Sequence, residues 1–322
     1  MSANVTVVVR YQEPFAKAIV KNMIVVVLGV SINYINASLF HTFSKHQIFY
    51  RNPRYILFIH LVVNDMIQVT LTITMFIISY TIYQIYVSIC WAIILLALLA
   101  TENTPLNLAC MAVECYIAVC MPLRHTQICT TRRTLLLIGL IWITSMASVL
   151  PDLFITLATE SPDFYRSRIL CLRENAFPNP LLVKKRDAIH SVFLVTVWIT
   201  IFYTYFKILF TAKAASKDAK KARNTILLHG FQLLLGISKY IAPPVLSGLK
   251  RWFPQHYVDY LFAYYIIVQI LPRSISPVIY GVRDNTFRRY LKRYLICKSL
   301  YSNRSEASGN EFQKKAKDLT TS

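Results

Sequence analysis

Long apolar stretches alternate with short polar links along most of the chain. A bilayer core about 30 Å thick is crossed by about 20 predominantly apolar helical residues. Because hydrocarbon satisfies no backbone N–H, stretches of this length are expected to be helices, and no alternating segments typical of a membrane barrel are seen. The sequence therefore predicts an all-α membrane protein, a bundle of seven transmembrane helices in one domain. The expected spans are residues 20–43, 55–80, 88–113, 134–157, 187–210, 223–247 and 257–280.

The composition agrees with this class. The 322 residues are 55% hydrophobic and 16% charged, whereas soluble domains carry about 25% charged residues. The mean hydropathy is +0.45, which leaves too much apolar surface for a disordered chain. The net charge of +20 is interrupted by long uncharged runs, so a nucleic-acid partner is not expected.

Lysine and arginine lie unevenly on the two sides of the predicted membrane. The links after the first, third and fifth spans and the C-terminal tail hold most of them, and such enrichment marks the cytoplasmic side. We therefore expect an extracellular arm at 1–19, the seven-helix domain at 20–283, and a cytoplasmic amphipathic helix and tail at 284–322. No cleavable signal peptide is seen, so the first span is expected to act as signal anchor. The outer link before the fifth span is assigned five acids: Asp152, Glu160, Asp163, Glu174 and Asp187.

The predicted topology indicates which cysteines and which glycosylation sequence lie on the outer side. Of seven cysteines, Cys90 and Cys171 are expected to reach the oxidising outer side, where a disulfide would tie the outer loop over the bundle mouth. Two unpaired thiols are the alternative. Asn4 begins an N-glycosylation acceptor on the outer arm. Cys297 follows a basic amphipathic stretch at 287–295, which predicts a short helix on the inner leaflet and a palmitoylation site.

Several ordered motifs resemble those of one receptor family. Residues 111–125 read MAVECYIAVCMPLRH and resemble the MAYDRYVAICxPLRY signature of odorant receptors, which are rhodopsin-like G-protein-coupled receptors. Residues 53–55 with Asp65, residues 221–229 and residues 276–284 are similar to motifs of helices 2, 6 and 7 of that family, and the variants look most like its fish branch. Cys90 stands where the family places its disulfide partner. The shared signature positions are Met111, Ala112, Tyr116, Ala118, Cys120, Pro122, Leu123 and Arg124.

The resemblance implies a receptor of the plasma membrane. It would bind a small-molecule odorant within the bundle and activate a stimulatory G protein that raises cAMP. Cys115 replaces the family's arginine, so Glu114 lacks its usual ionic partner, which allows a higher basal activity. The FYG element of helix 6 is also absent. The residues expected to couple to the G protein are Glu114, Cys115, Tyr116, Pro122, Arg124, Lys220, Lys221, Pro277 and Tyr280.

Asp65 is an ionisable residue in the middle of the second span. Such a residue is costly in hydrocarbon and is expected to face the bundle interior. It matches the family's sodium-linked acid, which implies a switch that senses sodium and joins helices 2, 3 and 7. A structural hydrogen-bond hub is the second interpretation, and the two are compatible. No other cofactor is expected.

Glu102 and Lys239 carry the ligand hypothesis. Lys239 would pair with Glu102 across the cavity, or it would hold a carboxylate or sulfonate of the ligand. The third interpretation is a lysine that extends toward the outer water. The predicted pocket mixes many apolar residues with few polar ones, as ligand sites do. It comprises Leu98, Thr101, Glu102, Phe193, Thr196, Val197, Ile237, Lys239, Tyr240, Tyr264 and Val268.

Other classes of function are disfavoured. The sequence shows no nucleophile–base–acid set and no metal-ligand spacing, so an enzyme is not expected. A receptor of the same fold for a non-olfactory ligand remains an alternative. A small-solute transporter is the other rival, although the spans do not form two related halves.

Overall fold

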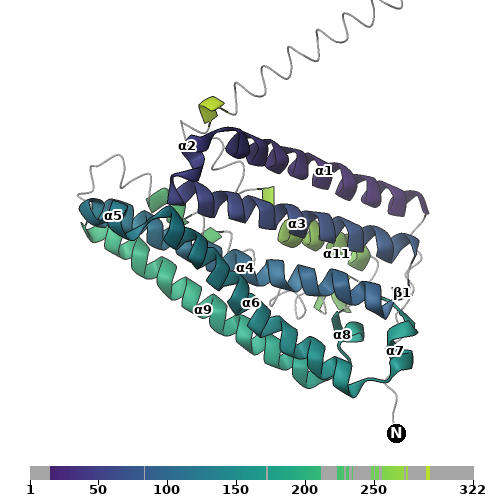
Figure 1. Cartoon of the computed structure of the whole chain (residues 1–322). Helices are drawn as coiled ribbons and strands as arrows, with labels where there is room; N and C mark the ends of the chain where they lie inside the picture. The colour runs from purple at the N-terminus through teal and green to yellow at the C-terminus, as the bar shows by residue number, and fades with distance from the viewer. Residues whose placement is uncertain are drawn as a thin grey trace, which may run out of the picture.

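The computed structural model describes residues 15–82, 84–171 and 173–211, together with 223–227, 230–231, 234, 248–249, 251–253, 256–271, 273–274 and 288–290. In this part of the chain, long helices lie side by side and a two-stranded sheet closes one end (Figure 1). The long helices are α1 (Phe15–Lys45), α3 (Pro53–Thr81), α4 (Val87–Cys120), α6 (Thr131–Thr159), α9 (Pro180–Thr211) and α11 (Tyr257–Tyr265), which continues as the π-helical segment η2 (Ile266–Ile270). The short elements are α2 (Gln47–Tyr50), α5 (Pro122–Ile128), α7 (Pro162–Arg166), α8 (Arg173–Ala176), β1 (Ile85–Tyr86) and β2 (Arg168–Ile169).

The first five predicted spans are confirmed. Among the described helices, five are long and apolar enough to cross a membrane: Ile19–Lys45, Pro53–Ile78, Val87–Cys120, Thr131–Thr159 and Lys184–Phe210. Helix α11 and segment η2 fall in the seventh predicted span. Most of the sixth predicted span lies outside the described residues.

Local signals explain where two of these helices begin. The side chain of Asn52 accepts a hydrogen bond from the backbone N–H of Arg54 at 3.1 Å, and Pro53 occupies the first turn of α3. Thr130 caps α6 in the same way through the backbone N–H of Arg133, at 3.4 Å. Such caps satisfy N–H groups that have no partner within the helix, and proline is tolerated there because its missing N–H is not needed.

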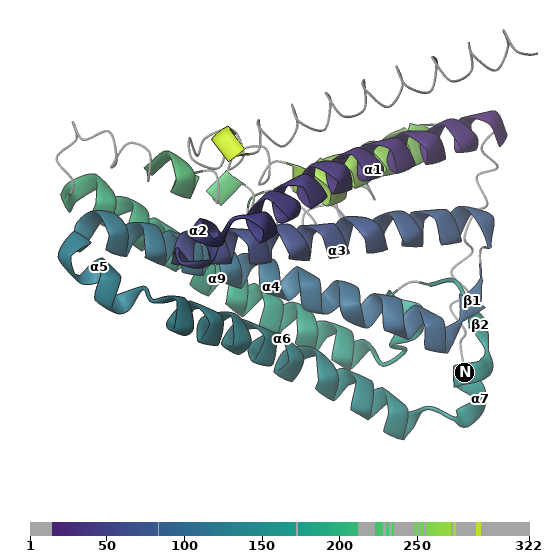
Figure 2. The same cartoon turned by 45° about the horizontal axis from the view of Figure 1, so that its top comes forward.

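Helix α4 lies at the centre of the described bundle. It contacts α3, α6 and α9, and α3 separates it from α1 (Figures 1 and 2). Phe58 and Leu61 of α3, Leu108 of α4 and Val197 of α9 belong to one buried cluster along these contacts. Because lipid is as apolar as these side chains, close packing rather than the hydrophobic effect stabilises such helix pairs.

The bundle has two different ends. The disulfide end comprises β1, β2, α7 and α8, and the α5 end comprises α2 and α5. These two groups lie at opposite ends of the long helices (Figures 1 and 2). Strand β1 pairs antiparallel with β2, with Ile85 opposite Ile169. A disulfide joins Cys90 at the start of α4 to Cys171 after β2, with a Cα–Cα distance of 5.5 Å. The predicted cysteine pair is therefore present, and it fixes the loop after α6 to α4.

Helices α6 and α9 are longer than the apolar stretches predicted. Asp152 lies inside α6, in agreement with the predicted span 134–157 and not with its assignment to the outer link, and Lys185 and Arg186 lie inside α9. The assignment of Asp152 to the link failed because charged residues near the end of a helix give the same sequence pattern as a polar loop. Here they pair between two neighbouring helices instead.

Candidate functional site

A cavity of about 240 Å³ lies between α3, α4 and the α11–η2 helix. Its volume is below the range of about 300–1,000 Å³ typical of drug-sized ligands, so it suits a compact molecule. Its wall is largely apolar, with a few polar side chains and one charged one. The lining residues are Gln68, Leu71, Thr72, Met75, Ala97, Thr101, Tyr265 and Arg273.

Hydrogen bonds hold the polar lining in place. The Tyr265 hydroxyl donates to the backbone carbonyl of Thr72 at 2.7 Å, which ties α11 to α3. The amide nitrogen of Gln68 donates to the carbonyl of Ala100 at 2.5 Å and to the Thr104 hydroxyl at 2.9 Å, which ties α3 to α4. Buried polar groups of this kind are costly unless they are hydrogen-bonded. The cavity is therefore framed by three helices that are joined through defined contacts.

Arg273 brings a positive charge to this cavity. Its guanidinium donates a hydrogen bond to the side-chain oxygen of Gln68, and it lies close enough to Asp65 for their charges to interact. Asp65 is 2% exposed and stands three residues before Gln68 on α3, so both side chains share one helix face. The interior position of Asp65 was predicted from the sequence, whereas Arg273 was not predicted as a site residue. The sequence feature that could have identified it is an arginine within the seventh apolar span, where a charged side chain is energetically unfavourable unless it has a function.

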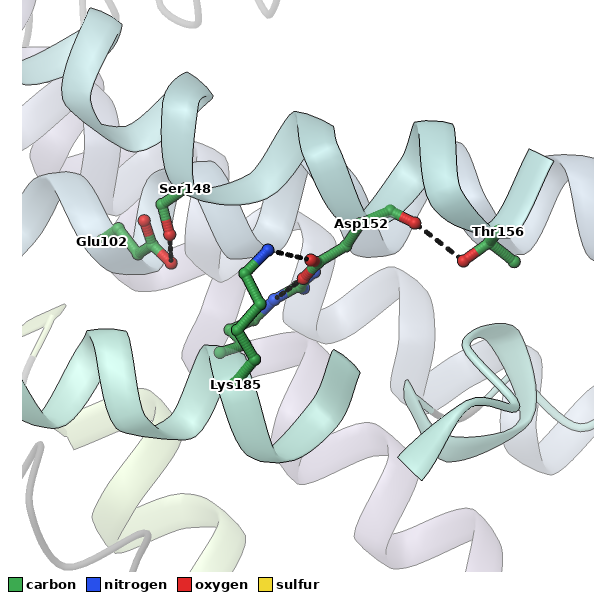
Figure 3. A network of polar contacts seen from close by, with 6 residues as sticks. Glu102, Ser148, Asp152, Thr156 and Lys185 are labelled. Carbon is green, nitrogen blue, oxygen red and sulfur yellow. Dashed lines mark hydrogen bonds and ion pairs between the residues drawn. The ribbon is translucent and has the colours of Figure 1, made fainter. Parts of the chain in front are cut away.

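The predicted ligand residues on α4 divide between two sides of the helix. Thr101 lines the cavity, and Leu98 packs against the buried cluster near the disulfide. Glu102 is 2% exposed and accepts a hydrogen bond from the Ser148 hydroxyl of α6 at 3.0 Å (Figure 3). Consecutive residues of an α-helix point about 100° apart, so Thr101 and Glu102 do not line this cavity together.

The other predicted pocket residues lie away from the cavity wall or outside the described residues. Val197 is buried in the core cluster. Thr196 is exposed, and its hydroxyl donates to the carbonyl of Val192 in its own helix. Phe193, Tyr264 and Val268 are partly or fully buried without lining the cavity, and Ile237, Lys239 and Tyr240 lie outside the described residues. The pairing of Lys239 with Glu102 stays a prediction.

A buried ion cluster joins α6 to α9 near the disulfide end. The side chain of Asp152 is 0% exposed, and its carboxylate lies 3.0 Å from Lys185 Nζ and 2.9 Å from Arg186 Nε, with a second contact from the same guanidinium (Figure 3). The Arg186 guanidinium also covers the Phe177 ring, 5.1 Å from its centroid. This cluster was not predicted from the sequence, because the acid is more than 30 residues away from its two cations in the chain.

A second ion cluster lies at the α5 end. Glu114 Oε2 lies 3.0 Å from Arg54 Nε of α3, and Glu114 Oε1 lies 3.1 Å from His125 Nε2 of α5. Glu114 therefore lacks the family's usual partner at position 115, but it has other ionic partners in Arg54 and His125. Cys115 does replace the family's arginine, but Arg54 supplies the cation from a neighbouring helix. Arg54 was predicted only as part of the motif at 53–55, without this role.

The remaining coupling residues are less fully described. Tyr116 meets the Tyr203 ring of α9 edge-on, with ring centroids 6.2 Å apart. Pro122 begins α5, and Arg124 is exposed on it. Four further predicted positions lie outside the described residues: Lys220, Lys221, Pro277 and Tyr280.

The link after α5 also holds a thiol whose pKa is raised, that of Cys129. Burial, and after it the negative charge of Glu114, raise the pKa of Cys129. Within the part of the chain that the structure describes, no group of His, Cys, Asp and Glu side chains is arranged to hold a metal ion.

Five apolar helices long enough to cross a membrane, packed side by side, with a disulfide at one end of the bundle, define a multi-pass membrane protein. Residues 35–311 match the family described as 7 transmembrane receptor (rhodopsin family). The chain belongs to this family, which confirms the seven-helix bundle and the class of receptor rather than enzyme. The chain is also 30% identical over 286 residues to Odorant receptor 131-2 of Danio rerio, across 86% of each protein. This relative agrees with the resemblance to fish odorant receptors in the signature motifs.

Proposed function

We propose that this protein is an odorant-type G-protein-coupled receptor. It binds a small ligand within the bundle and activates a stimulatory G protein that raises cAMP. The observation that carries the proposal is the identity of 30% with Odorant receptor 131-2, which extends over 86% of both chains. A ligand that prefers one of two conformations shifts their equilibrium by its difference in affinity, and this is how binding would reach the G protein.

The proposed orientation puts the disulfide end outside the cell and the α5 end in the cytosol. The excess of Lys and Arg in the links of the α5 end and in the tail supports this orientation. It makes 1–19 an extracellular arm with a glycan at Asn4, and 284–322 a cytoplasmic helix and tail. Loss of the glycosidase-sensitive mobility shift in Asn4→Gln tests it, and retention of the shift in that variant contradicts the glycan assignment.

The ligand would occupy the cavity between α3, α4 and α11. Leu71 and Met75 offer apolar contact, and Thr101 offers a hydroxyl at the wall. Lys239, in the sixth predicted span, stays the proposed anchor for an anionic group of the ligand, because an ammonium in an apolar medium strongly attracts an anion. Arg273 is a poorer anchor, since Asp65 opposes its charge.

The cytoplasmic face would dock the G protein at the α5 end. Glu114, Cys115, Tyr116, Pro122 and Arg124 lie there, and Lys220, Lys221, Pro277 and Tyr280 are assigned to the same face from the sequence. The contact of Glu114 with Arg54 at 3.0 Å joins α4 to α3. Activation would weaken this contact as the face opens.

A cAMP assay tests the proposal in cells that display the receptor with an olfactory stimulatory G protein. The panel consists of waterborne carboxylates, sulfonates and amines. We expect a response to anions that is lost in Lys239→Met and kept in Lys184→Met, an exposed lysine of α9. If no compound raises cAMP despite confirmed surface display, the assignment to an odorant-type receptor that couples in this way is contradicted.

A pair of threonines tests the place of the ligand. Thr101 lines the cavity, and Thr196 of α9 does not. Each threonine bonds a carbonyl of its own helix, so replacement by valine removes similar groups. We expect Thr101→Val to lower agonist potency several-fold, while Thr196→Val leaves it unchanged. The reverse result would indicate that the ligand binds next to α9 and not in this cavity.

A further inference from the structure

The environment of Asp65 does not fit a sodium ion. The resemblance to odorant receptors implies sodium at this acid, and sodium is held by oxygen atoms that leave room for the ion. In this protein the guanidinium of Arg273 interacts with the charge of Asp65 and donates to the oxygen of Gln68. On this face of α3, the guanidinium is thus hydrogen-bonded to the Gln68 oxygen, and its positive charge acts on the carboxylate of Asp65, three residues earlier.

We propose that Arg273 is a built-in counter-cation of Asp65 and takes the place of the sodium ion. The guanidinium is protonated at every pH at which the protein is folded, so its charge is permanent. A sodium ion that entered beside it would meet a like charge in a medium of low dielectric constant, where repulsion is strong. The receptor would therefore bind no sodium at Asp65.

The helices around Arg273 support a fixed position rather than a mobile side chain. The Tyr265 hydroxyl holds α11 to the carbonyl of Thr72 on α3 at 2.7 Å, and Val268 and Ile270 of η2 are buried. Gln68 in turn donates to Ala100 and Thr104 of α4. Arg273 is therefore the end of a polar chain that runs from α4 through α3 to the seventh helix, and it joins the three elements that a sodium ion would otherwise join.

Thermal unfolding of the purified receptor in lipid nanodiscs tests the proposal. The melting temperature is compared in NaCl and KCl of equal ionic strength, so that general screening cancels. We expect the same melting temperature in both salts for the wild type. In Arg273→Gln the acid loses its cation, and we expect a rise of several degrees with increasing sodium, because a ligand that binds the folded state raises its stability. The double variant Asp65→Asn with Arg273→Gln should lose this dependence.

Control variants separate the site from general effects. Arg251→Gln removes an exposed arginine and should leave the melting temperature equal in the two salts. Arg273→Lys keeps the charge and should also stay insensitive to sodium. Asp65→Asn alone should lower the melting temperature in both salts, because it removes the acid that opposes the Arg273 charge.

Two results would overturn the proposal. One is a higher melting temperature of the wild type in NaCl than in KCl that disappears in Asp65→Asn. The other is an Arg273→Gln variant that folds and shows no sodium dependence. If Arg273→Gln does not fold, a sodium titration of the wild type by calorimetry decides, with binding contradicting the proposal and its absence supporting it. No odorant or G protein is needed, so the result is independent of the proposed function.

Discussion

The two ends of the bundle each bury an acid, but they enclose it differently. At the disulfide end, the side chain of Asp152 is 0% exposed, and that of its partner Arg186 is 5% exposed. At the α5 end, the Glu114 side chain is 6% exposed, whereas its partners Arg54 and His125 are 34% and 24% exposed. The acid partners are neighbours on α9 in the first case, and they lie on two separate helices in the second.

This difference indicates that the Asp152 contacts are permanent, whereas the contact of Glu114 with Arg54 can open. When one member of a buried ion pair leaves, the other remains in low dielectric without a counter-charge, which is strongly unfavourable. A partner that is already one-third exposed exchanges the contact for water at small cost. The disulfide end is thus built to keep α6, α9 and α4 together, and the α5 end is suited to a rearrangement on activation.

The largest effect is expected at Asp152. Asp152→Asn removes the charge that Arg186 faces in the protein interior and should lower the free energy of unfolding by about 3–5 kcal/mol. The measurement is thermal unfolding of the purified receptor, together with its surface display. Lys185→Met is the control, since that side chain is 42% exposed, and its effect should stay below about 1 kcal/mol. Equal effects of the two variants would contradict the comparison.

The next effect concerns the disulfide. Cys171→Ser frees the loop that Cys90 holds to α4 and should lower stability by about 2–4 kcal/mol. Thermal unfolding and display at the cell surface report the loss. Cys129→Ser changes a free thiol at the other end and should leave both nearly unchanged. A wild-type melting temperature in Cys171→Ser would mean that the loop after α6 does not stabilise the bundle.

A smaller effect on stability, and a visible one on signalling, is expected at Arg54. Arg54→Gln removes the cation 3.0 Å from Glu114 and should cost about 1 kcal/mol, a low value because Arg54 is partly exposed. If the contact is made only in the inactive state, the same change raises basal cAMP about fivefold. Arg51→Gln, three residues earlier and exposed, is the matched control. Unchanged basal cAMP in Arg54→Gln would show that the contact is not part of the switch.

The smallest effect tests the charge of Glu114 through its neighbour. Burial and Glu114 raise the pKa of Cys129, so at neutral pH less of the thiol is thiolate, and alkylation should be slow and should accelerate at higher pH. Glu114→Gln removes the smaller of the two causes, lowers the pKa and should speed alkylation by less than about tenfold, because tenfold corresponds to one pKa unit. Mass spectrometry of alkylated peptides measures the rate at several pH values. Glu160→Gln, at the disulfide end, should leave the rate as it is.

The parts that the sequence predicted depend on local patterns. Apolar length alone predicts the first five spans, and the sorting of cysteines by membrane side predicts the Cys90–Cys171 bond, later found in the structure. The ion clusters depend instead on contacts between distant segments. Glu114 and Arg54 are 60 residues apart, and a motif that considers the adjacent residue, Cys115, does not reveal the pair.

The other contacts that were not predicted depend on how each helix is rotated about its axis. The depth of Glu102 in the third span was predicted, but the side of α4 on which it lies follows from how α6 packs, and Ser148 receives it there. The importance of Arg273 could have been predicted from the sequence, because it is the arginine of the seventh apolar span. Its partners on α3 could not have been predicted, because no sequence pattern in either segment specifies how the two helices are rotated relative to each other.

The π-helical segment η2 changes the direction in which Arg273, three residues after it, points relative to Tyr265. Tyr265 and Arg273 stand eight residues apart, and in a regular α-helix they would point about 80° apart. A π-turn absorbs about one extra residue, so the pair is spaced as if by seven residues, close to two full turns. Both side chains consequently reach the same cavity. In evolutionary terms, one inserted residue in a helix rotates everything after it, and this offers a one-step route by which a lipid-facing position becomes an interior one.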